Sequence, residues 1–322
     1  KRSFYVDDGL GCADSPADAV AVLEEARRAL AKFQIRLHKI SATDSSVLES
    51  FPPEDISVPK AGKNFDLFPP QHALGVSCSL RDDVFRVEAR RLSHPFTLRG
   101  VLAVIGGLYD PLGFIAPVAL TGRLIQRKAF ASSSGPPCWD EPLDPGLLPE
   151  WGRWVNELSA LAELSWPRFL GGAAPRELHV FADASEQAIG FVAYSRSFLD
   201  GTAAQVGFVA ASSKLAPRES TSMPRLELCA ALDAARGATE ILEESDGSFD
   251  RVYYYSDSQI VRGYLSNSSR RFSRYVARRV AQNHLPPCGS RAGLMALPPS
   301  PVSATSLVGR LLLLSTRRFR RS

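Results

Sequence analysis

The sequence predicts a mixed α/β protein with more than one domain. Three observations support this fold class. At 322 residues the chain is long enough for two or three hydrophobic cores. The second half shows three successive strand patterns, then a long helical pattern and one further strand pattern. The first half combines a short hairpin pattern with helical patterns, and Pro-rich stretches separate these parts.

The first element is a candidate hairpin, FYVDDGL at residues 4–10. An aromatic and β-branched run before Asp-Gly is typical of a tight turn, because Asp and Gly tolerate positive φ. The same hairpin would place two carboxylates, Asp7 and Asp8, at its tip, and paired carboxylates can hold divalent cations for phosphoryl transfer. The local pattern leaves both interpretations open.

Helix, loop and strand patterns follow the hairpin. Ser15 and Pro16 predict the start of a helix whose apolar stripe packs on another element. Residues 51–70 are rich in Pro and predict a loop. Residues 73–80 and 84–92 then predict two short strands joined by a charged turn.

The middle of the chain predicts helices that do not span a membrane. Its most apolar segment, residues 101–125, approaches the length of a membrane span. Asp110 and Pro111 lie at the centre of this segment, where a buried charge and a lost helical hydrogen bond together cost several kcal/mol. We therefore expect two segments joined by a turn. A linker-like stretch at residues 130–150 then precedes a helical stripe of Trp and Leu at residues 151–164.

Charge and cysteine content restrict the class of protein. The formal net charge is +4, and the acidic residues end at Asp257, whereas arginines recur from Arg262 to Arg321. Such a single-sign tail indicates contact with a polyanion or a poorly folded end. The five cysteines are scattered without a Cys-x-x-Cys pair, which favours reduced thiols over a disulfide framework or a zinc site. No charged-then-apolar leader is found, so we expect an intracellular protein, cytoplasmic or nuclear.

The second half predicts an antiparallel meander followed by a helix and a strand. The three strand patterns are ELHVFADAS, AIGFVAYSRSF and QVGFVAASSKL, and turn residues separate them. The helical pattern begins near Pro224, and the last strand pattern is RVYYYSDS at residues 251–258. Residues far apart in the sequence could therefore meet at one edge of a sheet.

Three carboxylates occupy special positions in these elements. Asp183 and Asp257 each end a strand pattern, and Glu227 lies in the first turns of the helix. Singly, each has an ordinary explanation: Asp183 could cap a turn, Glu227 could interact with the helix dipole, and Asp257 could be an N-cap.

Together the three carboxylates predict a metal site. If the two strands pair in parallel, their ends coincide, and the helix can bring the third carboxylate to the same point. Such a cluster repels itself unless cations neutralise it. Two Mg²⁺ (or Mn²⁺) ions roughly 4 Å apart would do so and would position water for attack on a phosphodiester. The pattern therefore predicts a metal-dependent nuclease.

The amino-acid sequences of these segments are similar to those of a known family. ELHVFADASEQAIGFVAYSRS, SMPRLELCAALDAARGA and YYYSDSQIVRGYL resemble the ribonuclease H region of Bel/Pao-type LTR retrotransposon polyproteins. FYVDDGL and ALGVSC resemble the palm and primer-grip positions of the same family's reverse transcriptase, and residues 98–125 resemble its connecting segment. The similarity runs in order from about residue 4 to residue 283.

The resemblance implies a fold and a division of the chain. It implies an α+β palm remnant plus a ribonuclease H-like mixed sheet, with three antiparallel strands, a helix and a further parallel strand. Residues 1–95 would be a partial palm with its primer-grip hairpin, and 96–172 a helical thumb or connection region. Residues 173–284 would be the ribonuclease H-like domain, and 285–322 a divergent, Arg-rich tail that we expect to be disordered. The chain would then be a fragment of a longer polyprotein.

The resemblance also implies an activity and its residues. Asp183, Glu227 and Asp257 would be the catalytic, metal-binding residues that cut the RNA strand of RNA·DNA hybrids, with metal-bound water as the nucleophile. Lys214, Arg218 and Arg225 would contact nucleic-acid phosphates, although for each of them taken singly simple solvation is the more common explanation.

Two departures from the family pattern limit the expected activity. Asp7 and Asp8 would be a polymerase remnant, because the upstream metal-binding aspartate of reverse transcriptases has no counterpart before Phe4, so we expect no polymerisation. The family's fourth ribonuclease H carboxylate has no counterpart after Asp257, and the only later histidine is His284. A catalytically inactive nucleic-acid-binding remnant is therefore the alternative function. An aspartic peptidase is set aside because its Asp-Thr/Ser-Gly signature is not found.

Overall fold

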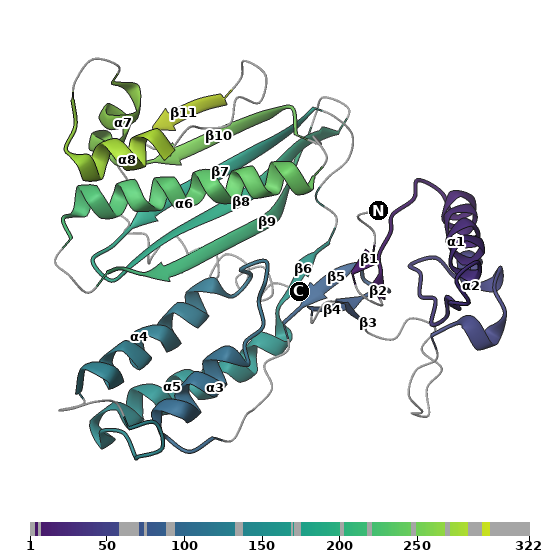
Figure 1. Cartoon of the computed structure of the whole chain (residues 1–322), viewed down its shortest axis with the longest axis horizontal. Coiled ribbons are helices and arrows are strands. Elements are labelled where there is room, and N and C mark those ends of the chain that lie inside the picture. Colours follow the sequence, from purple (N-terminus) through teal and green to yellow (C-terminus); the bar gives the residue numbers. More distant parts are fainter. Residues whose placement is uncertain are drawn as a thin grey trace. The chain divides into compact units, whose positions relative to one another are not determined.

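The protein divides into two compact units in the computed structural model. The structure describes residues 4–5, 8–57, 71–73, 76–87, 94–132, 138–168, 170, 175–199, 203–217, 221–245, 249–267, 271–282 and 292–296 (Figure 1). Unit 1 contains residues 1–88 and 162–168, and unit 2 contains residues 89–161 and 169–322. The finer division into palm, connection, ribonuclease H-like domain and tail stays a prediction.

Unit 1 begins with the hairpin that the sequence predicts. β1 (Phe4–Tyr5) pairs antiparallel with β2 (Asp8–Gly9), and Tyr5 lies opposite Asp8. Asp7 and the side chain of Asp8 lie outside the part of the chain that the structure describes. The hairpin is therefore confirmed, whereas the role of its two carboxylates stays a prediction.

The helices of unit 1 enclose a small core. α1 (Pro16–Ala31) starts as predicted, because the Ser15 hydroxyl accepts a hydrogen bond from the Asp18 N–H at 3.2 Å and Pro lies in the first turn. It packs its apolar stripe against α2 (Ser45–Glu49), and its Arg27 forms an ion pair with Asp55 of η1 (Pro53–Asp55) at 2.8 Å. The buried core residues are Ile40, Val47, Leu48 and Phe51.

A four-stranded antiparallel sheet completes unit 1. Its strands, in spatial order, are β3 (Gln71–Ala73), β4 (Val76–Ser79), β5 (Val84–Arg86) and β6 (Ser165–Pro167). The turn between β4 and β5 contains Asp83 with a φ of 52°, and the Arg168 guanidinium donates to the Asp83 carboxylate at 2.6 Å. The two strands predicted from the sequence are confirmed, and β6 joins them from a distant part of the chain.

Unit 2 begins with a helical region. Its elements are α3 (Leu98–Gly106), α4 (Ala116–Ser132), η2 (Pro145–Leu147), α5 (Leu148–Glu157) and η3 (Leu158–Glu163). The predicted break is confirmed: both carboxylate oxygens of Asp110 accept hydrogen bonds from the N–H groups of Phe114 and Ile115, just before α4. None of the helices in the described ranges combines the length and the apolar composition needed to cross a bilayer.

The rest of unit 2 is built on a five-stranded mixed sheet. β7 (Arg176–Ala184), β8 (Ala188–Leu199) and β9 (Ala203–Leu215) form the predicted antiparallel meander. β10 (Arg251–Ser256) pairs in parallel with β7, and β11 (Ala292–Ala296) pairs in parallel with β10. The spatial order is therefore β11-β10-β7-β8-β9.

One prediction about the tail differs from the structure. Residues 292–296 belong to the region that we expected to be disordered, but they form β11. This strand supplies backbone partners to β10, which would otherwise be an edge of the sheet. A pairing of this kind depends on tertiary contact, so the Pro-, Ser- and Arg-rich composition of the tail gave no sign of it.

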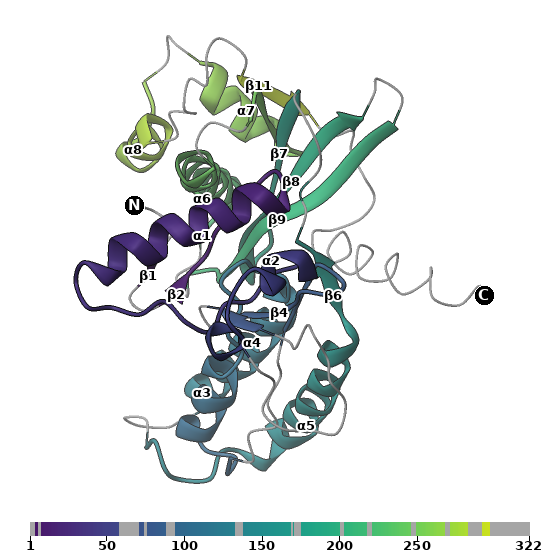
Figure 2. The ribbon, with the colours of Figure 1, turned by 90° about the vertical axis from the view of Figure 1, so that its right-hand side faces the viewer.

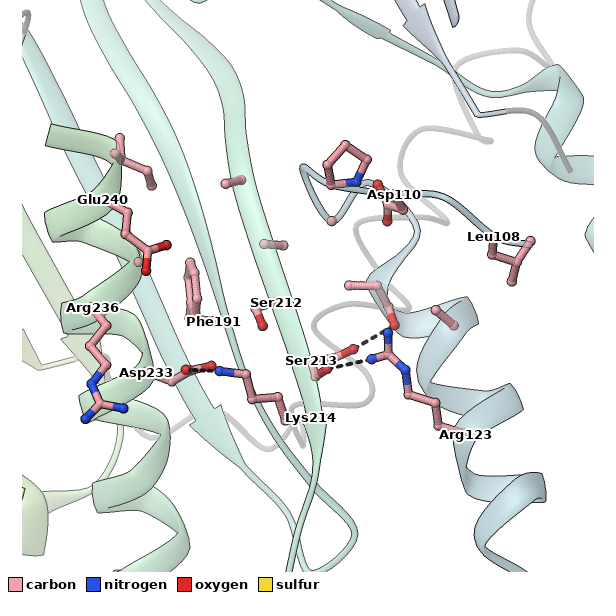
Figure 3. A pocket seen from close by; sticks show the side chains of 18 residues that line it. Leu108, Asp110, Arg123, Phe191, Ser212, Ser213, Lys214, Asp233, Arg236 and Glu240 are labelled. Atoms are coloured by element: carbon pink, nitrogen blue, oxygen red, sulfur yellow. Dashed lines mark hydrogen bonds and ion pairs between the residues drawn. The ribbon is translucent and has the colours of Figure 1, made fainter. Parts of the chain in front are cut away.

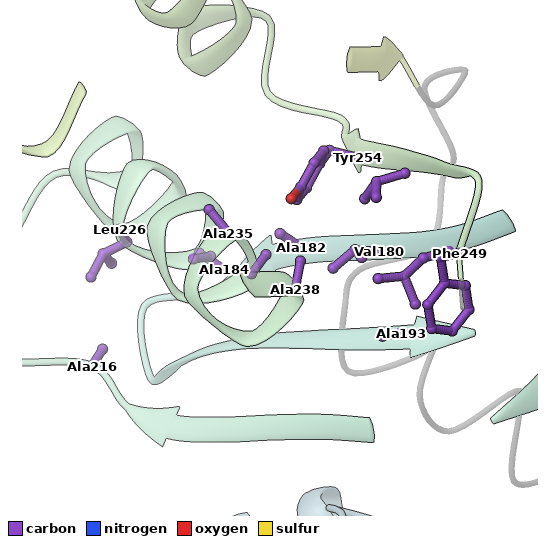
Figure 4. Close-up of a cluster of buried hydrophobic side chains, with 14 residues drawn as sticks. Val180, Ala182, Ala184, Ala193, Ala216, Leu226, Ala235, Ala238, Phe249 and Tyr254 are labelled. Atoms are coloured by element: carbon purple, nitrogen blue, oxygen red, sulfur yellow. The ribbon is translucent and has the colours of Figure 1, made fainter. Parts of the chain in front are cut away.

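α6 (Met223–Glu244) covers one face of this sheet, as Figures 1 and 2 show from two directions. The core between them contains apolar strand residues and small helix residues (Figure 4). Val180 and Val252 are fully buried, and burying a side chain of this size stabilises the fold by about 1.5–3 kcal/mol. Small residues such as Ala235 and Ala238 let the helix approach the strands closely. α7 (Gln259–Ser266) and α8 (Arg274–Gln282) pack beside α6.

The helical region of unit 2 caps the free edge of β9. The Arg123 side chain donates to the Ser213 carbonyl at 2.8 Å, and the Ala211 N–H donates to the Leu112 carbonyl at 2.8 Å. Gly113 follows Leu112 with a φ of +77°, and a Cβ there would overlap the Ala211 carbonyl. The close approach of this turn to β9 therefore requires glycine.

Gly113→Ala is expected to lower the free energy of unfolding by about 1–3 kcal/mol, because it adds positive-φ strain and forces the turn away from β9. Urea titration followed by circular dichroism measures the change. Gly152→Ala in α5 is the matched control: an added Cβ there meets nothing within 4 Å, so this variant should be as stable as the parent or more so. Equal stability of the parent and Gly113→Ala would contradict the assigned role of this turn.

Candidate metal centre

The parallel pair β7 and β10 places two carboxylates side by side. The register pairs Tyr255 with Phe181, so the next positions on the same face are Asp257 and Asp183. Asp183 is near the carboxyl end of β7, and Asp257 directly follows β10. This confirms the parallel pairing that the sequence analysis required.

Glu227 joins these two residues from α6. It lies one turn inside the helix, and one carboxylate oxygen from each of Asp183, Glu227 and Asp257 lies within 4.8 Å of the others. The predicted convergence of the three side chains is therefore confirmed. Their catalytic and metal-binding roles stay predictions.

Burial and mutual repulsion disfavour the charged forms of two of these groups. Burial raises the pKa of Glu227 to about 8, and the negative charges of Asp183 and Asp257 add to the effect. Burial raises the pKa of Asp183 to about 6, with a further contribution from Asp257, although the hydrogen bond from the Ala184 N–H opposes the shift. Asp257 is exposed. Protons therefore stabilise this cluster in the absence of another cation.

The donor set fits a hard divalent cation. Carboxylate oxygens are the ligands that Mg²⁺ and Mn²⁺ prefer. Oε2 of Glu227 is buried and has no hydrogen-bond partner among the residues that the structure describes. This costs free energy unless a cation or proton satisfies it. Ordinary capping does not explain the cluster fully, because Ser258 rather than Asp257 caps α7 and donation by the Ala184 N–H occupies only one oxygen of Asp183.

The three cations predicted to contact phosphates differ in their surroundings. The Lys214 ammonium forms an ion pair with Asp233, so a phosphate would have to compete with that carboxylate. The Arg225 guanidinium lies over the ring of Tyr275, 4.9 Å from its centroid. Arg218 lies outside the described residues. Contact of any of the three with nucleic acid stays a prediction.

A separate pocket of about 520 Å³ lies between α6, β9 and the start of α4 (Figure 3). Arg123, Lys214, Asp233 and Glu240 line it with charges of both signs. The three clustered carboxylates are not among its lining residues. This pocket is therefore distinct from the carboxylate cluster.

Sequence reasoning did not find two arrangements near these residues. One is the pair Lys214 and Asp233, which joins β9 to α6. The other is the contact of Tyr275 and Arg279 in α8 with Arg225 in α6. The sequence contained a sign of the Lys214–Asp233 pair, because Asp233 interrupts an otherwise apolar run. It also contained a sign of the Tyr275 and Arg279 contact, because these two residues have i, i+4 spacing.

A match to a protein-family model shows which family this chain belongs to. The model described as the Pao retrotransposon-like RNaseH-like domain matches residues 97–258, half of the chain. The chain belongs to this family. Residues 97–258 include α3, α4 and α5 and the sheet up to the end of β10, together with all three clustered carboxylates. Residues 97–258 are thus an RNase H-like domain of the Pao retrotransposon type, called the Pao domain below.

Partial similarities to solved structures accompany the family match. Ribonuclease H1 from the halophilic archaeon Halobacterium salinarum shares 22% identity over 38% of this chain and 86% of that chain, with a TM-score of 0.29. Two structures of the foamy viral protease-reverse transcriptase with double-stranded DNA share 14% identity over 72% of this chain. Their TM-scores are 0.44 and 0.43, and the match spans only 38% and 45% of those viral chains. A comparison with curated protein sequences gives no match.

Without divalent cations, the Pao domain should lose stability as the pH rises. Folding raises the pKa of Glu227 from 4.5 to about 8 and that of Asp183 from 3.8 to about 6, so the folded state binds more protons than the unfolded state across this window. The stabilisation is complete below pH 4 and is lost as the pH approaches 8. Thermal unfolding in EDTA from pH 5 to pH 8 tests this, and added Mg²⁺ should raise the melting temperature more at pH 8 than at pH 5.

Glu227→Gln should remove most of this pH dependence, since the amide resembles the protonated acid. At pH 8 in EDTA the variant should melt at a higher temperature than the parent and should gain less from Mg²⁺. Glu244→Gln, at the exposed end of the same helix, is the control and should behave like the parent. An unchanged pH profile for Glu227→Gln would argue against the repulsive cluster.

Proposed function

We propose that this Pao domain cuts the RNA strand of RNA·DNA hybrids with Mg²⁺ or Mn²⁺ held by Asp183, Glu227 and Asp257. The observation that carries the proposal is the convergence of the three carboxylates within 4.8 Å. The unpartnered buried oxygen of Glu227 supports it, because a cation would satisfy that oxygen. Family membership of residues 97–258 supports the ribonuclease H class of reaction.

The chain's own residues would contribute rigidity and charge. Two ligands come from neighbouring strands of one sheet, and the third comes from a helix packed on that sheet. When bound, divalent cations lower the pKa of a coordinated water and stabilise the negative charge that develops on the phosphate. Because the fold fixes the carboxylates before substrate binds, little reorganisation is needed at the site.

The substrate class follows from the reaction class. Recognition of an RNA·DNA hybrid depends on its A-like shape and on 2′-hydroxyls rather than on sequence. We therefore propose cleavage with little sequence preference. With three carboxylates, binding of a second cation is expected to be weak, so activity should rise with cation concentration over a wide range.

A second candidate function is nucleic-acid binding without cleavage. The charge of α7 and α8 favours it, because these helices contain several arginines and no acidic residue. Electrostatic binding of this kind weakens steeply as salt increases. This alternative predicts complexes with hybrids but no Mg²⁺-dependent product.

Purified protein should convert a labelled RNA·DNA hybrid to shorter RNA fragments in Mg²⁺ or Mn²⁺, and the DNA strand should stay intact. Asp183→Asn, Glu227→Gln and Asp257→Asn should each lower the rate more than about a hundredfold, since several kcal/mol of charge stabilisation are lost. Gel electrophoresis of the end-labelled RNA measures the rate.

Glu186→Gln is the matched control, because Glu186 is an exposed carboxylate close to Asp183 in the sequence and is not a member of the cluster. This variant should cut at the parental rate. If the parent yields no product at any cation concentration while still binding the hybrid, the nuclease proposal is rejected and the binding function is retained.

A further inference from the structure

The pocket between α6, β9 and the start of α4 has walls that direct contacts hold in place (Figure 3). The Arg123 guanidinium donates to the Ser213 carbonyl, and the Ser213 hydroxyl donates to the Ala116 carbonyl, at 2.8 Å in each case. On the other side α6 lies directly on the ring of Phe191, because a Cβ at Gly237 would overlap that ring. The pocket is therefore built into the fold, and its volume of about 520 Å³ is typical of a small-molecule site.

One carboxylate of this pocket has fewer partners than it can accept. The side chain of Asp233 is 10% exposed, and its Oδ1 accepts from the Lys214 ammonium. Its Oδ2 is buried and has no hydrogen-bond partner in the part of the chain that the structure describes. A carboxylate accepts several hydrogen bonds, and leaving a buried oxygen unpaired costs free energy. Asp233 therefore favours a further N–H donor at this point of the pocket.

The partner of this carboxylate can be exchanged. The side chain of Lys214 is 57% exposed, and a lysine ammonium is a compact charge on a flexible stem. Rotation of that stem would open the Asp233 carboxylate to the pocket and would free the ammonium for another anion. The pair thus offers one acceptor and one donor to a ligand that inserts between them.

Charge balance selects the class of ligand. An anion alone would draw Lys214 away and leave the buried Asp233 without a cation, which is strongly unfavourable. A cation alone would displace the Lys214 ammonium and then lie beside it as a like charge. A molecule with both charges satisfies Asp233 with its ammonium and Lys214 with its carboxylate. Only this third arrangement leaves every charge with a partner.

The rest of the lining agrees with a ligand of this kind. Among the described residues that line the pocket, cations and acids are equal in number: Arg123, Lys214 and Arg236 with Asp110, Asp233 and Glu240. A surface that binds a nucleic-acid backbone needs an excess of cations. A balanced lining instead suits a molecule that is itself neutral overall but charged at both ends.

We propose that this pocket binds a small zwitterion of the peptide class, with its ammonium on Asp233 and its carboxylate on Lys214. The pocket does not include the carboxylate cluster, so this site is independent of the proposed nuclease function. It gives Lys214 a role other than the phosphate contact that the sequence predicted.

The dipeptide alanyl-alanine is the probe, because its acetylated and amidated forms each lack one of the two charges on the same skeleton. Titration of the isotope-labelled chain with alanyl-alanine, followed by NMR, should shift the amide signals of Ser212 and Gly237, which line the pocket. The acetylated and amidated forms should each bind at least about tenfold more weakly, because each leaves one charged partner unmatched.

Two variants should change this preference in opposite directions. Asp233→Asn removes the acceptor for the ammonium, so the zwitterion should bind no better than its acetylated form. Lys214→Gln removes the donor for the carboxylate and leaves Asp233 unpaired, so the amidated form should bind at least as well as the zwitterion. Circular dichroism confirms that each variant is folded.

Lys128→Gln is the matched control. Lys128 belongs to α4, is exposed, and forms an ion pair with Glu150 at 2.7 Å, and neither residue lines the pocket. This variant removes the same charge and breaks a pair of the same type. Its affinity for alanyl-alanine should stay within about twofold of the parental value, because the pocket keeps all its charges.

The outcomes separate this site from the nuclease. Equal binding of all three dipeptide forms, or no shift of the two amide signals, would overturn the zwitterion site. Shifts of the same signals by an RNA·DNA hybrid but not by alanyl-alanine would also overturn it, in favour of nucleic-acid contact by Lys214. Selective binding of the zwitterion in EDTA, by a chain that never cuts hybrids, would support the site and reject the nuclease alone.

Discussion

The parallel pairing of β10 with β7 is the constraint on which the carboxylate cluster depends. It brings Asp257 beside Asp183 although 74 positions of the chain, residues 183 to 257, separate them. A shift of one residue would turn one of the two carboxylates to the other face of the sheet. In this register Val180 pairs with Tyr254 and Val252 pairs with Leu178, and both valines are fully buried in the core beneath α6. The hydrophobic core therefore fixes the site's geometry.

That geometry is electrostatically unfavourable by itself. Three carboxylates share a small volume, and one oxygen of Glu227 is buried without a partner. Folding energy from the core must hold them together, and either protons or cations can then relieve the repulsion. At neutral pH a divalent cation relieves it more fully than one proton, because its two positive charges interact with all three carboxylates. This repulsion is therefore a physical reason to propose that a divalent cation binds to the cluster.

The sequence carried enough information for the strands and the carboxylates, because both depend on local pattern. Alternating residues defined β7, β8 and β9, and the acids at strand ends could be placed from topology alone. Contacts made by short or atypical segments could not be predicted from the sequence. β6 has three residues, β11 has no alternating polar pattern, and the Arg225 contact with Tyr275 joins helices whose packing no local pattern specifies.

The helical region preceding the sheet is part of the same folded unit. The family match begins at residue 97, before α3, and the Arg123 side chain and the Leu112 carbonyl both bond to the edge strand β9. An uncovered edge strand offers its N–H and C=O groups to other chains. Capping by α4 and its preceding turn removes that hazard at one side of the sheet, and β11 removes it from β10 on the other side. The sheet is thus covered at both edges around the carboxylate cluster, which lies at the ends of the inner strand β7 and its neighbour β10.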